Sequence, residues 1–340
     1  MLGHATESID YNLPVDSITR KPVFAFSCNR RIRETYNGPL LKTVDGDVYP
    51  ASLEASVGKK IVKLYDQKVR FNCAAFNVEA VGDVYLRKKV VDTFDPAYTF
   101  PTSNTYTTFS APYTQVRVIN GWHPHLTAGN NYDLVQVQAI GGVLTNMKFG
   151  NTSAGAQWIG LGGGRGVDWE VVAPATLYCI ELSLGAYFEL PGASFFTEDA
   201  GVLTVCDPSN SDGRAPIFSA SNSQNELCFD VGSAYMRINH YKISERHQLF
   251  GGIDSPDQGY NAYLGNFSEK TTIRNSSGFS GVSLRKDAIS SGFTDGYIGR
   301  DATGSTYSGE IYELIIGDFE VPNDSVNEAF RDMADFYALT

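Results

Sequence analysis

The stretch that decides the fold lies near the end of the chain, where residues 296–300 read GYIGR and residues 307–316 read YSGEIYELII. The second segment predicts a strand, because its apolar residues supply surface for a sheet. Gly309 permits a bend as the chain enters this strand. Glu313 stands among the apolar residues, and we expect it to satisfy buried donors rather than to act as a catalytic carboxylate. The apolar positions are Ile311, Leu314 and Ile316.

One helix is expected after this strand. Residues 322–325 read PNDS, which is the chemistry of a helix N-terminus. The residues that then recur with a helical period are Val326, Phe330, Met333, Phe336 and Tyr337. The pattern predicts a short C-terminal helix that docks on the sheets.

Strand signals extend upstream from the closing stretch at short, regular intervals. Short alternating segments separated by turn residues indicate a β-sandwich or barrel. Further strands are expected nearer the N-terminus, where 134–140 alternates with a period of two. The predicted strands are 23–26, 61–65, 116–119, 134–140, 177–184, 203–206, 226–231, 235–239, 247–250, 271–274, 282–284, 296–299 and 310–316.

Composition bounds the class of protein. The chain has 340 residues, of which 42% are hydrophobic and 19% charged, and its formal net charge is −11. An acidic surface repels phosphate backbones, so nucleic acid is not an expected partner. The sequence shows no secretory signal and no apolar stretch long enough to span a bilayer, so we expect no membrane insertion and synthesis in a cytoplasm. The five cysteines have no ligand spacing, which favours buried reduced thiols over zinc.

The closing stretch resembles the last strands and terminal helix of concanavalin A-like, laminin-G-like domains. This resemblance implies an all-β fold, a jelly-roll sandwich with a short C-terminal helix. We expect an N-terminal arm at residues 1–20 and a sandwich over residues 21–340, with an inserted or separate β subdomain at about residues 90–170.

The opening of the chain carries a second resemblance. Residues 24–27 (FAFS), 30–31 (RR), 36–40 (YNGPL) and 62–67 (VKLYDQ) are similar to the start of arabinofuranosidase-type catalytic domains, an opening also found in bacteriophage structural proteins. In that pattern the Tyr-Asp-Gln is followed by a glycine turn. Here it is followed by residues 68–72 (KVRFN), and the disulfide cysteines of the secreted enzymes are not evident.

Candidate site residues are few. Glycoside hydrolysis needs two carboxylates across a cleft, but none of the strand carboxylates can be assigned by motif. Trp122, His123 and His125 form a candidate carbohydrate site, because sugars stack on aromatic faces; an ordered loop or a subunit contact is the alternative. No catalytic residue and no metal ligand is assigned. The carboxylates considered were Asp66, Glu181, Asp230, Glu310 and Glu313.

Two segments contain residues typical of ligand-binding loops, but ordinary turns explain both of them better. Residues 160–166 (GLGGGRG) lack the Lys-Ser/Thr of a phosphate loop. Residues 254–259 (DSPDQG) and Asp295 offer oxygen ligands for Ca²⁺, but the same residues are ordinary turn chemistry. Ca²⁺ is therefore the one cofactor left open.

These observations lead to two functional hypotheses. The first is a bacteriophage virion protein on the particle surface, as head decoration, head fibre or tail-associated adhesin, with other virion proteins and further copies of itself as partners and host-surface carbohydrate as a possible ligand. The alternative is an arabinofuranosidase-like glycoside hydrolase. The viral hypothesis places the chain in the virion and rests on the resemblance.

Overall fold

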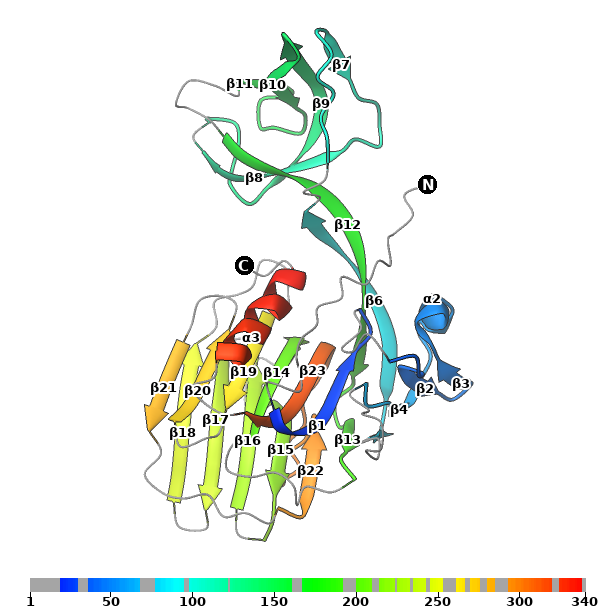
Figure 1. Cartoon of the computed structure of the whole chain (residues 1–340), viewed down its shortest axis with the longest axis vertical. Helices are drawn as coiled ribbons and strands as arrows, with labels where there is room; N and C mark the ends of the chain where they lie inside the picture. Colours follow the sequence, from blue (N-terminus) through cyan, green and yellow to red (C-terminus); the bar gives the residue numbers. More distant parts are fainter. Residues whose placement is uncertain are drawn as a thin grey trace. The chain divides into compact units, whose positions relative to one another are not determined.

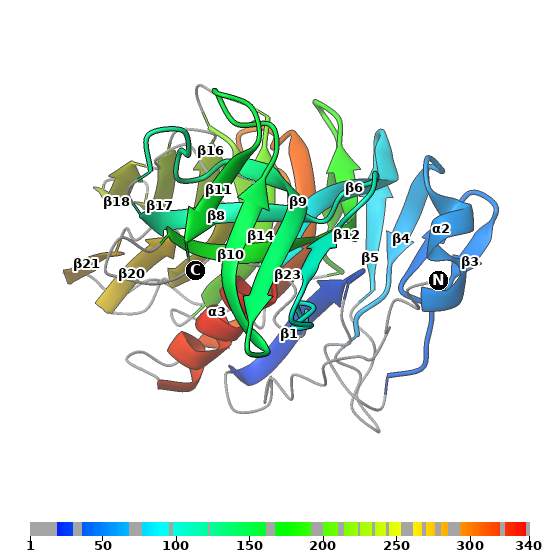
Figure 2. The same ribbon diagram turned by 90° about the horizontal axis from the view of Figure 1, so that it is seen from above.

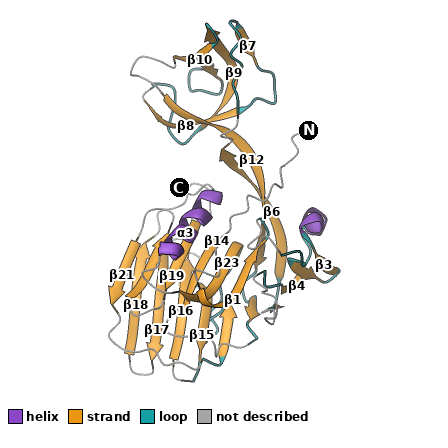
Figure 3. Ribbon diagram, viewed as in Figure 1, coloured by secondary structure: helices purple, strands orange, loops and turns teal. Residues whose placement is uncertain are grey.

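The computed structural model describes most of the chain, and its residues form two compact units. One unit comprises Met1–Lys89 with Leu177–Thr340, and the other comprises Val90–Thr176. Strands dominate both, as Figure 3 shows. The described residues are 19–29, 36–67, 77–94, 98–121, 123–160, 167–191, 200–209, 214–223, 225–232, 235–242, 245–252, 261–266, 270–275, 280–284, 293–319 and 324–337.

The larger unit contains two antiparallel sheets (Figure 1). In the ten-stranded sheet β5, β4 and β3 run beside α2 (Leu53–Ser56), which follows the short η1 (Pro50–Ser52) (Figure 2). In order of pairing its strands are β18 (Glu245–Gly252), β17 (Tyr235–Lys242), β16 (Asn225–Gly232), β15 (Pro216–Ser221), β22 (Asp295–Ile298), β13 (Tyr187–Glu189), β5 (Val78–Val81), β4 (Ile61–Leu64), β2 (Leu41–Thr43) and β3 (Gly46–Val48).

The second sheet is built around the predicted closing strand, β23. Its neighbour β12 and the strand β6, which pairs with β12, both continue into the other unit. In order its strands in this unit are β12 (Val167–Leu182), β23 (Gly309–Phe319), β14 (Ala200–Pro208), β19 (Asn261–Asn266), β20 (Lys270–Asn275) and β21 (Ser280–Leu284), with β1 (Thr19–Ser27) on β23 and β6 (Val84–Phe94) on β12. Each segment predicted to be a strand falls on a strand, and the all-β sandwich class is confirmed.

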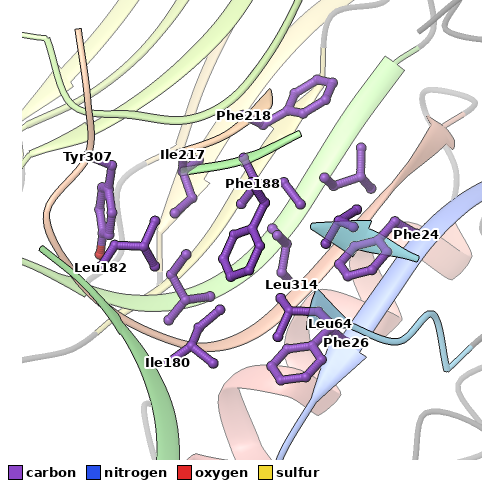
Figure 4. Close-up of a cluster of buried hydrophobic side chains, with 14 of the residues drawn as sticks. Phe24, Phe26, Leu64, Ile180, Leu182, Phe188, Ile217, Phe218, Tyr307 and Leu314 are labelled. Atoms are coloured by element: carbon purple, nitrogen blue, oxygen red, sulfur yellow. The ribbon is translucent and has the colours of Figure 1, made fainter. Parts of the chain in front are cut away.

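One apolar core lies between these sheets (Figure 4). Because side chains alternate between the two faces of a strand, every second residue of the central strands reaches this core. Fully burying one such side chain contributes roughly 1.5–3 kcal/mol, so the core is the main source of stability. Its labelled members are Phe24, Phe26, Leu64, Ile180, Leu182, Phe188, Ile217, Phe218, Tyr307 and Leu314.

The Tyr-Asp-Gln motif of the opening segment ties β1 to the rest of the unit. Asp66 Oδ1 accepts a hydrogen bond of 3.1 Å from the backbone N–H of Ala25. The Gln67 side chain donates to the carbonyl of Ser27 at 2.6 Å, and its backbone N–H donates to the carbonyl of Ala25 at 2.9 Å. Both side chains are buried, and these hydrogen bonds give Asp66 a structural role.

The C-terminal helix α3 (Asp324–Phe336) is confirmed, and it contacts β14 and β19. Met333 and Tyr337 are buried beneath it. The Tyr337 hydroxyl donates to Glu313 Oε2 at 3.2 Å, and Glu313 is fully buried. Glu313 therefore serves as the structural carboxylate that the sequence predicted. The predicted cap residues 322–323 lie outside the described part of the chain.

The smaller unit has its own core. Its strands are β7 (Tyr106–Thr108), β8 (Gln115–Gly121), β9 (Asn131–Ile140), β10 (Val143–Phe149) and β11 (Gln157–Gly160). They pair in the order β11-β10-β9-β8, with β7 also on β9. The buried residues of this core are Val116, Val118, Tyr132, Leu134, Val137, Met147, Phe149 and Ile159.

Several other expectations concern single residues or segments. Cys28, Cys179, Cys206 and Cys228 are buried and unpaired, as predicted, whereas Cys73 lies outside the described residues. Among the described residues, no helix is long and apolar enough to cross a membrane. The predicted N-terminal arm is described only from Thr19, where β1 begins.

Candidate functional site

Strand β16 buries polar side chains on one face and apolar side chains on the other. Glu226, Cys228 and Asp230 occupy alternate positions, and all three are buried. The residues between them join the core, as expected for a period of two. A strand with an acidic face that is also shielded from water needs compensating cations or donors.

Arg214 supplies that compensation. Its Nη2 lies 3.2 Å from Glu226 Oε2, and its Nε lies 2.8 Å from Asp301 Oδ2 and 4.0 Å from Asp230 Oδ1. The side chain of Arg214 keeps 20% of its surface exposed, whereas those of Asp230 and Asp301 keep none. One guanidinium therefore pairs with three carboxylates and is the most exposed part of the cluster. We call Arg214, Glu226, Asp230 and Asp301 the Arg214 cluster.

The loop after β22 closes the cluster through Asp301. Its Oδ1 accepts three hydrogen bonds of 2.8 Å, from the backbone N–H and hydroxyl of Thr303 and from the backbone N–H of Ser305. Glu226 Oε1 accepts the backbone N–H of Ala302 at 2.9 Å. Asp301 thus orders the loop, and Glu226 joins the loop to Arg214.

Burial shifts the pKa values of Glu226 and of the neighbouring Cys228. Burial raises the pKa of the Glu226 carboxyl above its usual value, and the Ala302 N–H and Arg214 offset this only in part. Burial, with Asp230 and Glu226 nearby, raises the pKa of Cys228 well above its usual value. The thiol therefore stays protonated at neutral pH. Glu226 loses its proton at a higher pH than an ordinary glutamate does. A carboxyl whose pKa is raised by burial beside a specific charge partner marks a candidate site.

A second group of charges lies on the other sheet and is better explained by strand pairing. Asp207 of β14 stands opposite Glu310 of β23, which is unfavourable for two like charges. Lys89 Nζ lies 3.1 Å from Asp207 and 3.7 Å from Glu310, and burial raises the pKa of Asp207. Glu181 stands opposite Glu310 on the other side and pairs with Arg87. Cations from β6 thus balance this row of acids.

The residues predicted to bind carbohydrate are described only in part. Trp122 lies outside the described residues. The rings of His123 and His125 meet edge to face at 5.7 Å, and the backbone N–H of His125 donates to His123 Nδ1 at 3.3 Å. Burial, and then His125, lowers the pKa of His123. The pair orders its own turn, and its role in sugar binding stays a prediction.

Of the five carboxylates considered from the sequence, only Asp230 belongs to the Arg214 cluster. Asp66 and Glu313 are structural, and Glu181 and Glu310 belong to the charged row. Sequence reasoning missed Arg214, Glu226 and Asp301. An alternating acidic strand normally indicates a solvent-facing side, and no local signal shows that the loops of Arg214 and Asp301 cover it.

Metal binding is not supported by the described residues. Among them, no group of three or more His, Cys, Asp or Glu could hold a metal ion. Of the residues considered for Ca²⁺, Asp254 and Asp257 lie outside the described part, and Asp295 begins β22 with its carboxylate accepting the Thr294 hydroxyl. Most of the glycine loop, residues 161–166, is also outside it.

Comparison with known proteins gives matches among solved structures alone. No family model and no curated protein matches the sequence. A structure described as an arabinofuranosidase complexed with arabinofuranosyl-α-1,2-xylobiose has a TM-score of 0.46 and 11% identity, covering 91% of this chain and 61% of that chain. A mutant GH54 α-L-arabinofuranosidase soaked with 4-nitrophenyl α-L-arabinofuranoside has a TM-score of 0.46 and 13% identity, with coverages of 91% and 62%.

A third match is a single domain. Domain 4 of AbnA, a GH43 extracellular arabinanase from Geobacillus stearothermophilus, was solved with arabinotriose; it has a TM-score of 0.35 and 13% identity, covering 44% of this chain and 75% of that domain. The chain spans about three-fifths of the length of the two arabinofuranosidases.

Proposed function

We propose that the chain acts on a carbohydrate at the Arg214 cluster, as an arabinofuranosidase-like glycoside hydrolase. The observation that carries the proposal is the convergence of Glu226, Asp230 and Asp301 on one partly exposed guanidinium. Glycoside hydrolysis uses two carboxyl groups, one of which must hold a proton at working pH. Glu226, with its raised pKa, suits the acid role, and Asp230 supplies the second carboxylate.

Each member of the cluster then has a distinct task. Glu226 donates its proton to the leaving oxygen as the glycosidic bond breaks, and a water molecule adds to the anomeric carbon and gives its proton to the second carboxylate, Asp230. Arg214 offers donors at the solvent-facing edge, where sugar hydroxyls would be bound. Asp301 positions the loop and is a positioning residue, because its oxygens are already engaged by Thr303, Ser305 and Arg214. The opening segment's resemblance suggests the furanoside class as the first substrate to try.

The test is hydrolysis of 4-nitrophenyl α-L-arabinofuranoside by the full chain. We expect slow release of nitrophenol from the wild type and a loss of roughly a hundredfold or more in Glu226→Gln, which keeps the shape of the side chain but cannot donate the proton. Glu189→Gln, in the same sheet but exposed, is the matched control and should retain the wild-type rate.

Two results would contradict the hydrolase proposal. One is an absence of turnover in a wild-type chain whose circular dichroism shows folded β-structure. The other is turnover that Glu226→Gln leaves unchanged. Sugar binding without turnover, detected by calorimetry and lost in Arg214→Lys, would retain the cluster as a binding site and remove the hydrolytic role.

The place of the chain on a bacteriophage particle is a separate proposal that rests on the sequence resemblance. The four buried, unpaired cysteines fit a protein that folds in a reducing compartment before assembly. Mass spectrometry of purified particles is expected to find the chain at a stoichiometry of many copies. Recovery of the chain only from the soluble fraction of infected cells would argue against this location.

A further inference from the structure

The solvent face of the smaller unit carries side chains that the proposed function does not use. Strands β7, β9, β10 and β11 pair side by side. Val137, Met147 and Ile159 point into the core, so their neighbours along each strand point to the opposite face. Those neighbours are Gln136, Gln138, Asn146, Lys148 and Trp158, with Tyr106 opposite Gln138. We call these six residues the aromatic–amide face.

Hydrogen bonds order the polar part of this face across three strands. Asn146 donates to Gln138 Oε1 at 2.6 Å, and Gln138 in turn donates to the Tyr106 hydroxyl at 3.0 Å. Gln136, in the next row, donates to the hydroxyl of Thr108 at 2.9 Å. The amides are therefore held in place before any ligand arrives, which lowers the entropic cost of binding.

Two large aromatic rings remain in contact with water on the same face. Tyr106 is 58% exposed and Trp158 is 39% exposed. Their ring centroids lie 5.7 Å apart in an edge-to-face arrangement, although β7 and β11 are separated by β9 and β10. Exposed aromatic rings next to ordered amides form a surface that can pack against the C–H face of a sugar ring while hydrogen bonding its hydroxyls.

Lys148 is the one charged side chain among the six residues of this face. Lys148 Nζ lies 5.9 Å from the centroid of Trp158 and has no acidic group within 4.0 Å among the described residues. Asp133, the other charged side chain of these strands, accepts hydrogen bonds from the side-chain amides of Gln115 and Asn151. In a chain of net charge −11, a cation beside the Trp158 ring is complementary to a ligand that carries a carboxylate.

We propose that the aromatic–amide face binds a glycan containing uronic-acid residues, with Trp158 and Tyr106 packing on sugar rings and Lys148 pairing with a sugar carboxylate. This site is distinct from the Arg214 cluster and does not depend on hydrolysis there. It is also distinct from the predicted Trp122–His125 site, because none of its side chains belongs to that segment.

The test measures binding of two tetrasaccharides to the full chain by calorimetry, one of galacturonic acid and the other a neutral xylotetraose. We expect the acidic tetrasaccharide to bind about tenfold more tightly than the neutral one, and this preference to disappear in Lys148→Met and to weaken as salt is raised. Trp158→Ala and Tyr106→Ala should each weaken binding about tenfold. Tyr113→Ala is the matched control, since Tyr113 is 36% exposed in the same unit but is not part of the face.

Three outcomes would overturn the proposal. The first is that the acidic tetrasaccharide does not bind at a concentration of about 10 mM, since any affinity below that would be too weak for a usable site. The second is equal affinity for the two tetrasaccharides. The third is wild-type affinity in Trp158→Ala. If Trp158→Ala fails to fold, Trp158→Leu and Lys148→Met carry the same test. Repeating the measurement in Glu226→Gln, where affinity should be unchanged, separates this proposal from the hydrolase.

Discussion

The Arg214→Ala variant is expected to lose about 3–5 kcal/mol of unfolding free energy at neutral pH, the usual cost of removing one partner from a buried ion pair. Asp230 and Asp301 have no exposed side-chain surface, so their charges depend on the guanidinium of Arg214 for compensation. Urea denaturation followed by circular dichroism measures the loss. The variant should also have no activity on the aryl furanoside.

Acid provides an internal check on this explanation. Burial already raises the pKa of Glu226, so this carboxyl, left without Arg214, should take up a proton first as the pH is lowered, and the difference between variant and wild type should then shrink. The control is Arg87→Ala, whose pair with Glu181 is 41% and 36% exposed and should be worth less than about 1 kcal/mol. A deficit in Arg214→Ala that is as small as in this control would show that the cluster is not a coupled electrostatic unit.

The Gly309→Ala variant is expected to lose about 3 kcal/mol or more, because two penalties combine at this position. Gly309 has φ +139°, a conformation that side chains rarely adopt, and a Cβ atom would lie 2.3 Å from the carbonyl oxygen of Asp207 and 2.9 Å from the backbone N of Ser209. These are backbone atoms of the neighbouring chain segment, so relief requires β14 and β23 to separate at their ends.

Gly304→Ala separates the two penalties. Gly304 has φ +89°, but nothing lies within 4 Å of a Cβ placed there. Only the conformational cost remains, and a loss of about 1 kcal/mol is expected. Thermal denaturation of both variants measures the difference. If the two substitutions lower the stability equally, the close approach of β14 to Gly309 adds no penalty of its own.

The positions of many strands along the chain, and of the closing helix, could be predicted from the sequence because their signals are local. The apolar spacing in 307–316 indicates a strand, and the spacing after Asp324 indicates a helix. The structural role of Glu313 was also predictable, since an acid within an apolar strand must find a donor. Its donor, Tyr337, lies 24 residues away, and only the docking of α3 identifies it.

The two candidate sites, by contrast, are products of the tertiary structure. In sequence, Glu226 and Asp230 are ordinary polar positions of an alternating strand, and Ala302, which contacts Glu226, is 76 residues away. The alternation in β9 predicts that its glutamines share the polar face of a strand. It does not predict their neighbours, because Tyr106 is 32 residues from Gln138 and Trp158 lies on β11.

Local patterns in the sequence identify many of the strands, the apolar faces of those strands and the helix that closes the larger unit. Only the tertiary structure decided that one acidic strand face is buried around Arg214 while the amide face of β9 meets water beside two aromatic rings. The physical reason is that alternation specifies which side chains share a face, whereas burial, charge pairing and aromatic contact depend on which distant strand or loop lies against that face.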